Sequence, residues 1–88
     1  MLVSEQIRAA RAALKWTIDD LSNQAEVSVR TIKRIEAARG VPSANTQTLE
    51  AIRTALEAAG IEFIGTPTDA PGVRLHRLPD ARSAPQER

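Results

Sequence analysis

Residues 17–37 read "TIDDLSNQAEVSVRTIKRIEA" and contain two short helical patterns that lie about three residues apart. Thr17 followed by Asp20 predicts a capping box at the start of the first pattern, with Asp in place of the usual Glu. Ser28 is a good N-cap for the second pattern. Helices over about 17–24 and 28–37, joined by so short a turn, have helix-turn-helix spacing. The apolar positions that would bury these two helices are Leu21, Ala25, Val27, Ile32 and Ile35.

Two further helices are predicted, one on each side of this pair. Ser4 would cap a first helix over about 4–14, with Glu5 in its first turn. Asn45 or Thr46 would cap a last helix, which Gly60 ends. Both segments repeat apolar residues at helical spacing, which indicates one buried face on each helix. These residues are Ile7, Ala10 and Leu14 in the first helix and Leu49, Ile52, Leu56 and Ala59 in the last.

The chain after Gly60 has a different character. Residues 61–78 read "IEFIGTPTDAPGVRLHRL", where apolar residues alternate at 61 and 63 and again at 73 and 75, around a turn with Pro and Gly. This pattern predicts two short strands. A lone hairpin is marginal in water, so we expect it to lie on the helices or to pair with another chain. Residues 79–88 are polar and contain proline, and we expect them to be disordered.

Composition limits the classes of protein. The chain has 88 residues, of which 42% are apolar and 26% charged, and this predicts one small soluble domain. With no cysteine and with His76 as the single histidine, we expect no disulfide, no metal site and no cofactor. No segment reads as a signal peptide or approaches the roughly 18 apolar residues of a membrane span, so we expect a cytoplasmic protein.

The charge is unevenly distributed along the chain. The net charge is only +1, yet residues 8–39 hold seven basic and four acidic side chains. With Ile32 and Ile35 turned inward, the second helix of the motif would present a basic surface to the outside. A solvated helix face is the plainer interpretation of that surface. Asp19 and Asp20 read as helix N-terminal charge and not as a catalytic pair, so we expect no enzymatic activity. The outward residues of the helix are Ser28, Val29, Arg30, Lys33 and Arg34.

Residues 4–60 or so resemble the lambda-repressor/Cro-like (xenobiotic response element type) helix-turn-helix family. The resemblance rests on Trp16-Thr17, Leu21, Val27-Ser28, Thr31-Ile32 and Ile35-Glu36. It implies a mainly α fold of four to five helices at residues 1–60, followed here by a short C-terminal strand pair at 61–78. It also implies that bases are read by Ser28, Val29, Arg30 and Arg34, with Lys33 at the edge, and that phosphates meet Thr17, Ile18 and Arg39. A scaffold pair of Arg11 with Glu36 is implied as well.

Three positions depart from the family's pattern. Ile18 stands where Gln is usual, which removes a side-chain contact to phosphate and leaves the backbone N–H groups. Glu26 and Lys15 stand where Gly is usual. If either adopts a left-handed conformation, it costs roughly 1 kcal/mol more than glycine would.

These patterns predict a sequence-specific regulator, acting as a repressor, that binds double-stranded DNA as a homodimer on a two-fold operator. One small domain has little to cover a long apolar seam, so we expect the dimer to form along it. In the alternative arrangement, the hairpin folds back onto the helices of its own chain and no such dimer forms. The rival function is a protein-interaction module, such as an antitoxin or anti-activator, whose C-terminal segment grips an additional protein partner. The seam consists of Leu49, Ile52, Leu56, Ala59, Ile61, Phe63, Val73 and Leu75.

Overall fold

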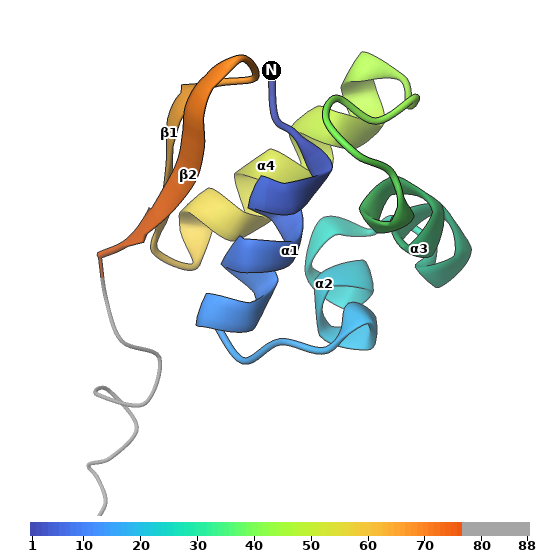
Figure 1. The fold of residues 1–88 in the computed structure, drawn as a ribbon. Coiled ribbons are helices and arrows are strands. Elements are labelled where there is room, and N and C mark those ends of the chain that lie inside the picture. Colours follow the sequence, from blue (N-terminus) through green and yellow to red (C-terminus); the bar gives the residue numbers. More distant parts are fainter. Residues whose placement is uncertain (77–88) are drawn as a thin grey trace, which may run out of the picture.

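The computed structural model describes residues 1–76, which form four helices followed by two antiparallel strands (Figure 1). This confirms the predicted mainly α class with a strand pair at its C-terminal side. Residues 77–78 of the predicted extension and the predicted disordered tail at 79–88 lie outside the described residues. The elements are α1 (Ser4–Ala13), α2 (Ile18–Ala25), α3 (Val29–Ala37), α4 (Thr46–Ala58), β1 (Ile61–Thr66) and β2 (Asp69–Leu75).

Three of the four helices begin at the predicted caps. Thr17 Oγ1 accepts the Asp20 N–H at 3.0 Å and Asp20 Oδ2 accepts the Thr17 N–H at 2.8 Å, which completes the capping box of α2. Ser28 Oγ and Asn45 Oδ1 each accept the backbone N–H three residues later, at 3.1 and 2.7 Å. These bonds satisfy donors that a helix N-terminus would otherwise leave without partners.

The predicted cap of α1 is wrong. Val3 occupies the N-cap position, and because its side chain has no acceptor, no side-chain bond caps the helix there. The Val3 N–H donates instead to Gln6 Oε1 at 3.0 Å. Ser4 is completely buried, and its hydroxyl donates to the carbonyl of Ile35 at 2.6 Å. Its side chain therefore joins α1 to α3 across the core instead of capping its own helix.

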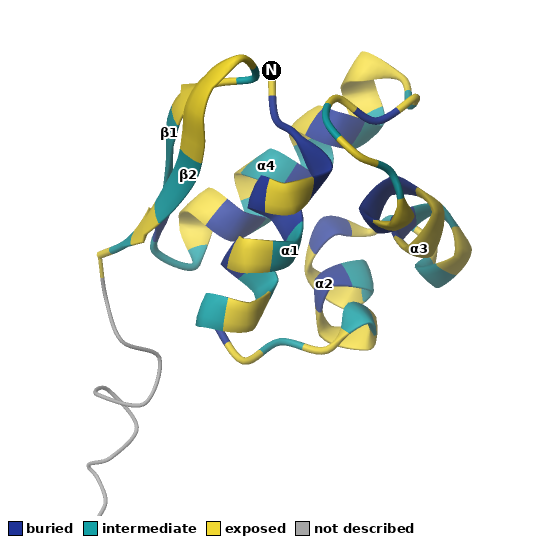
Figure 2. Ribbon diagram, viewed as in Figure 1, coloured by how far each residue is buried: buried dark blue, intermediate teal, exposed yellow. Residues whose placement is uncertain are grey.

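One apolar core lies between the helices, and Figure 2 shows the buried sides of the helices turned toward one another. Each large apolar side chain buried there stabilises the fold by about 1.5–3 kcal/mol relative to its exposed state. Every helix contributes to this core, so the position of α3 depends on the other three. The large apolar side chains with almost no exposed surface are Ile7, Leu21, Ile32, Ile35, Ile52 and Leu56.

The hairpin folds back onto the helices of the same chain. Ile61 pairs with Leu75 and Phe63 with Val73, and these four side chains pack on the core. Gln6 on α1 holds the far end of the hairpin, because its Nε2 donates to Ile64 O at 3.0 Å and to Gly72 O at 2.9 Å.

This packing corrects the predicted dimerisation seam. Leu49, Ile52, Leu56 and Ile61 are buried within the single chain, so the expectation that one domain cannot cover them is wrong. The hairpin lies on the helices of its own chain, which is the alternative arrangement that the sequence left open. The other hydrophobic members of the seam, which stay partly exposed, are Ala59, Phe63, Val73 and Leu75.

Both positions where Gly is usual do adopt left-handed backbone conformations. Lys15 has φ 59° and ends the turn after α1, while Glu26 has φ 57° and forms the C-cap of α2. Each costs about 1 kcal/mol relative to glycine. The tight turn between α2 and α3 is therefore kept against a local preference, by the burial of the helices on either side.

Candidate nucleic-acid interface

Helix α3 has a buried face and a basic face. Ile32 and Ile35 are almost completely buried, at 0% and 1% exposure, whereas Arg30, Lys33 and Arg34 are exposed. Figure 2 shows the buried side of α3 toward the other helices and the exposed side outward. Arg30 and Arg34 lie four residues apart, so their side chains leave the helix from the same face, one turn from each other.

The cations of this face differ from the arginines of α1, α4 and β2, because those arginines have carboxylate partners. Ion pairs join Arg8 to Glu5 (3.8 Å), Arg11 to Glu36 (2.9 Å), Arg53 to Glu57 (3.0 Å) and Arg74 to Glu62 (3.2 Å). Within residues 1–76, no carboxylate pairs with Arg30, Lys33 or Arg34. The positive charge of α3 is therefore not neutralised by the chain itself, although the net charge is close to zero. Such a face attracts anions.

Arg34 is held at one end of the face. Its Nη1 donates to the carbonyl of Ser43, in the loop between α3 and α4. A guanidinium has five N–H donors in a fixed plane, so one bond to a carbonyl leaves others available. The contact restricts the rotamers of a long side chain and reduces the entropy that it would lose on binding.

Ser28 and Val29, two of the predicted base-reading residues, are less available for contacts with bases. The Ser28 hydroxyl accepts the Thr31 N–H and donates to Thr31 Oγ1 at 2.9 Å, so its donor and acceptor are both used at the helix start. Val29 is half-buried and offers apolar surface only. Ser28 can therefore contact a base edge only by sharing or giving up its cap.

The predicted phosphate contacts lie on two segments. At the start of α2 the Thr17 hydroxyl is used in the capping box, and the Ile18 side chain packs on the core. Only backbone N–H groups face outward there, beside the carboxylates of Asp19 and Asp20, which repel a phosphate. Arg39 is exposed in the loop after α3. Its positive charge interacts with the single carboxylate of Glu5. Arg39 is thus the stronger of the two candidates for a phosphate contact.

The contact between Arg11 and Glu36 that the resemblance implies is present. Arg11 Nε lies 2.9 Å from Glu36 Oε2, and its Nη2 donates to Oε1 at 3.0 Å, which makes a two-point contact between planar groups. The Glu36 side chain is only 6% exposed and that of Arg11 24%. Arg11 also donates from Nη1 to Trp16 O at 2.9 Å. This pair fixes the end of α3 to α1.

Sequence reasoning missed a second link between α1 and α3. Arg8 Nη1 donates to Glu36 O and, at 3.3 Å, to Ala38 O. Ser4, Arg8 and Arg11 follow each other at spacings of four and three on α1, so they form one stripe along the helix. This spacing is visible in the sequence, but no local pattern indicates that the end of α3 lies against this stripe.

Glu5 adds a third contact, to the loop after α3. Its Oε1 accepts the Gly40 N–H at 3.1 Å, and the Ser4 N–H donates to Gly40 O at 2.8 Å. The pKa of Glu5 is lowered, first by its own backbone N–H and next by that of Gly40. The loop that carries Arg39 is thus tied to the start of α1.

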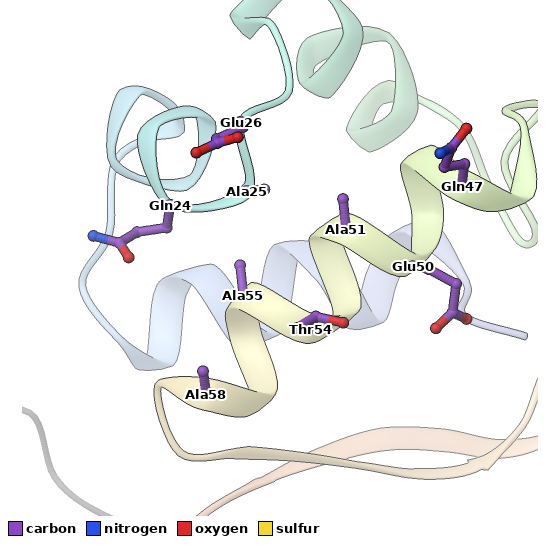
Figure 3. Close-up of a pocket in the computed structure, with 9 residues that line it drawn as sticks. All are labelled: Gln24, Ala25, Glu26, Gln47, Glu50, Ala51, Thr54, Ala55 and Ala58. Atoms are coloured by element: carbon purple, nitrogen blue, oxygen red, sulfur yellow. The ribbon is translucent and has the colours of Figure 1, made fainter.

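A shallow groove of about 480 Å³ lies between the end of α2 and α4, on a different part of the surface (Figure 3). Ala51, Ala55 and Ala58 point from α4 toward the end of α2, and Glu26 and Glu50 lie at its rim. These lining residues include no histidine, and Thr54 is the one hydroxyl among them. Within the described chain, no three His, Asp or Glu side chains gather to hold a metal, and no helix is long and apolar enough to cross a membrane.

Comparison with known families agrees with this geometry. A family model described as "Helix-turn-helix domain" matches residues 3–63, which is more than half of the chain. The matched range includes all four helices and the first residues of β1. No curated protein matches the chain significantly.

Proposed function

The chain belongs to this helix-turn-helix domain family, and from that premise we propose that it is a sequence-specific transcriptional regulator of double-stranded DNA, acting as a repressor. In such proteins the second helix of the motif enters the major groove while the first crosses the backbone. The observation that supports this proposal most is the basic face of α3, whose three cations have no carboxylate partner within residues 1–76.

The roles of the side chains follow from their chemistry. Arg30 and Arg34 carry planar donors that match guanine O6 and N7. Lys33 and Arg39 supply charge to phosphates, which sets affinity more than specificity. Val29 offers an apolar surface for a thymine methyl group. Bound in the groove, the protein blocks access to that stretch of duplex, which is the simplest route to repression.

We further propose that two copies bind a two-fold operator. A two-fold dimer presents two recognition helices roughly 34 Å apart, which matches half-sites about one helical turn from each other. The partly exposed hairpin residues Phe63, Val73 and Leu75 are the candidate contact between the copies. Their apolar surface is covered only in part by the chain's own core.

A selection from random duplexes tests the proposal. We expect the full-length protein to enrich one motif with two-fold symmetry, and its affinity to fall steeply as salt rises, because phosphate contacts release counterions. A protein that enriches no motif and binds all duplexes equally weakly would contradict sequence-specific regulation.

A second candidate is a protein-interaction module, and the edges of the hairpin favour it. The His76 N–H donates to Gly60 O at 2.8 Å, which makes these residues a hydrogen-bonded pair. Such pairs alternate along an antiparallel ladder, so the backbone groups of the intervening positions point to the two outer edges. An extended segment of a partner can add to such an edge. A variant that no longer binds duplex but still captures a protein partner would support this candidate. By this alternation, the positions whose backbone groups point to the outer edges are Ile61, Phe63, Val73 and Leu75.

A further inference from the structure

The last turn of α3 depends on α1 for its hydrogen bonds. A helix leaves its final carbonyls without partners inside the helix. Here the Ala38 N–H still donates to Ile35 O at 3.3 Å, but the chain then leaves α3 in an extended conformation, with ψ 168°, so no further helical turn supplies donors to the carbonyls of Glu36 and Ala38. The carbonyls of Glu36 and Ala38 instead accept hydrogen bonds from the Arg8 guanidinium.

Arg8 is well suited to this position electrostatically. The C-terminal end of a helix carries partial negative charge, which a cation stabilises. The guanidinium of Arg8 lies at that end and also pairs with Glu5 at 3.8 Å. Glu5 in turn accepts the Gly40 N–H, so Arg8 is part of a polar network that reaches both sides of Arg39.

This network helps to determine where the end of α3 points. The Ser4 hydroxyl on Ile35 O and the two-point contact of Arg11 with Glu36 hold α3 up to Glu36, and the Arg8 bond to Ala38 O lies beyond them. The apolar contacts of Ile32 and Ile35 hold the helix against the core but leave it free to tilt slightly, because hydrophobic contacts have little directionality. Hydrogen bonds to base edges have a narrow range of distance and angle. A small tilt at the C-terminal end would therefore displace Arg34, one turn before that end, and Arg39 just beyond it.

We propose that Arg8 is a positioning residue for DNA reading. It does not touch the duplex; by bonding the carbonyls of Glu36 and Ala38 it holds the recognition helix and the Arg39 loop in the orientation that fits the groove. This inference rests on the proposed function, since it concerns the same interface.

The test begins with the full-length wild-type protein and the duplex that it selects. Affinity is then measured for that duplex and for a random duplex of equal length, at several salt concentrations, for Arg8→Met and Arg8→Lys. Arg53→Met is the matched control, because it removes an ion-paired helix arginine that contacts Glu57 and the ring of Phe63 and not α3. Amide chemical shifts of residues 36–40 are recorded for each protein without DNA.

We expect Arg8→Met to weaken binding to the selected duplex about tenfold, the size of one lost base contact, with little change on the random duplex or in the salt slope. Arg8→Lys should restore most of the affinity, because an ammonium can still donate to a carbonyl. Shifts of residues 36–40 should move in Arg8→Met and stay unchanged in Arg53→Met.

Two results would overturn the proposal. Equal losses on both duplexes with a salt slope reduced by about one would make Arg8 a phosphate contact, and unchanged affinities would leave it no role in reading. If Arg8→Met does not fold, Arg8→Gln, which keeps a neutral donor, is measured against the same criteria. Failure of the wild-type protein to select any duplex refutes the proposed function itself, while the amide shifts still report whether Arg8 holds the end of α3.

Discussion

Helix α3 and the hairpin both present basic side chains to solvent, but only the hairpin neutralises its own. On the hairpin, Arg74 Nη1 lies 3.2 Å from Glu62 Oε1 and His76 Nε2 lies 2.6 Å from the same oxygen. The hydrogen bond from His76, followed by the Arg74 charge, lowers the pKa of Glu62. The one acid of α3, Glu36, is turned inward to Arg11, so the outer face of that helix stays positive.

This difference explains why the net charge of the chain is a poor guide to its ligand. A charge of +1 summed over 88 residues hides a surface on which pairs cancel in one region and cations stand alone in another. Anion attraction depends on the local sum within about a Debye length, which is roughly 8–10 Å at ordinary salt. The face of α3 meets that condition, whereas the paired face of the hairpin does not.

Replacing Arg11 with Met should have the largest effect, because this cation belongs to the scaffold and not to the binding face. Its loss leaves the carboxylate of Glu36 buried without its partner, which should lower the free energy of unfolding by about 3–5 kcal/mol. Chemical denaturation measures this. Arg74→Met, which breaks an exposed pair, should cost about 1 kcal/mol or less and serves as the control. Equal losses for the two variants would contradict the distinction between buried and surface pairs.

The next prediction concerns the unpaired cations. Arg30→Ala should weaken binding to the selected duplex by about 1–3 kcal/mol and relax the preference at one base step, whereas Lys33→Ala should weaken all duplexes alike and reduce the salt slope by about one. Arg74→Ala should change neither quantity, because that cation is neutralised on the hairpin. Titrations on selected and random duplexes measure these effects. If Arg30→Ala weakened both duplexes equally, its assignment to base reading would be wrong.

The local features of the fold could be predicted from the sequence. The capping box at Thr17 and Asp20 and the caps at Ser28 and Asn45 all depend on residues within a few positions of each other. The inward face of α3 followed from the spacing of its isoleucines in the same way. The helix-turn-helix and the basic face could therefore be predicted from the spacing of apolar residues and from the cap residues.

Features that depend on distant segments could not be predicted in this way. The hydroxyl of Ser4 could serve a local cap or a carbonyl 31 positions away, and it serves Ile35. Arg8 received its role only because the chain leaves α3 at Ala38 without another cap. The burial of Leu49 and Leu56 was misjudged because the sequence left open whether the hairpin lies on its own helices or on a second chain. It lies on its own helices, held there in part by Gln6.

A third prediction tests whether the hairpin joins two copies. Leu75→Glu places a charge among the partly exposed apolar residues and should weaken a dimer formed there by about 1.5–3 kcal/mol, the value of burying one leucine. Light scattering at several concentrations, with circular dichroism to verify the helices, measures this. Thr68→Glu, in the exposed turn, is the control. A wild-type chain that stays monomeric at high micromolar concentration would remove the preassembled dimer.

A fourth prediction extends the comparison to the backbone. The turn before α3 uses Glu26 at φ 57°, whereas the hairpin bulge uses Gly65 at φ 79°. Glu26→Gly should therefore stabilise the protein by about 0.5–1 kcal/mol, since it relieves a left-handed side chain. Gly65→Ala should destabilise it, because a Cβ would lie 2.2 Å from Ala70 O. Thermal unfolding of both variants measures this, and a loss of stability in Glu26→Gly would show that the Glu26 side chain contributes more than its strain costs.

The smallest expected effect concerns the neutralised face of the hairpin and its dependence on pH. The pKa of Glu62 lies below its ordinary value of 4.5 in the folded chain, chiefly because His76 donates to it and secondly because of Arg74. A depressed carboxyl pKa means that the ionised form stabilises the fold, fully above pH 4.5, and that this contribution is lost as pH falls through the folded value. Wild type should therefore unfold at a slightly higher temperature than Glu62→Gln near pH 6, and the two should converge once the pH has fallen below the lowered pKa of Glu62. The exposed position of the pair keeps the difference small. A gap that widens as pH falls would have the wrong sign and would mean that the carboxylate of Glu62 does not stabilise the hairpin.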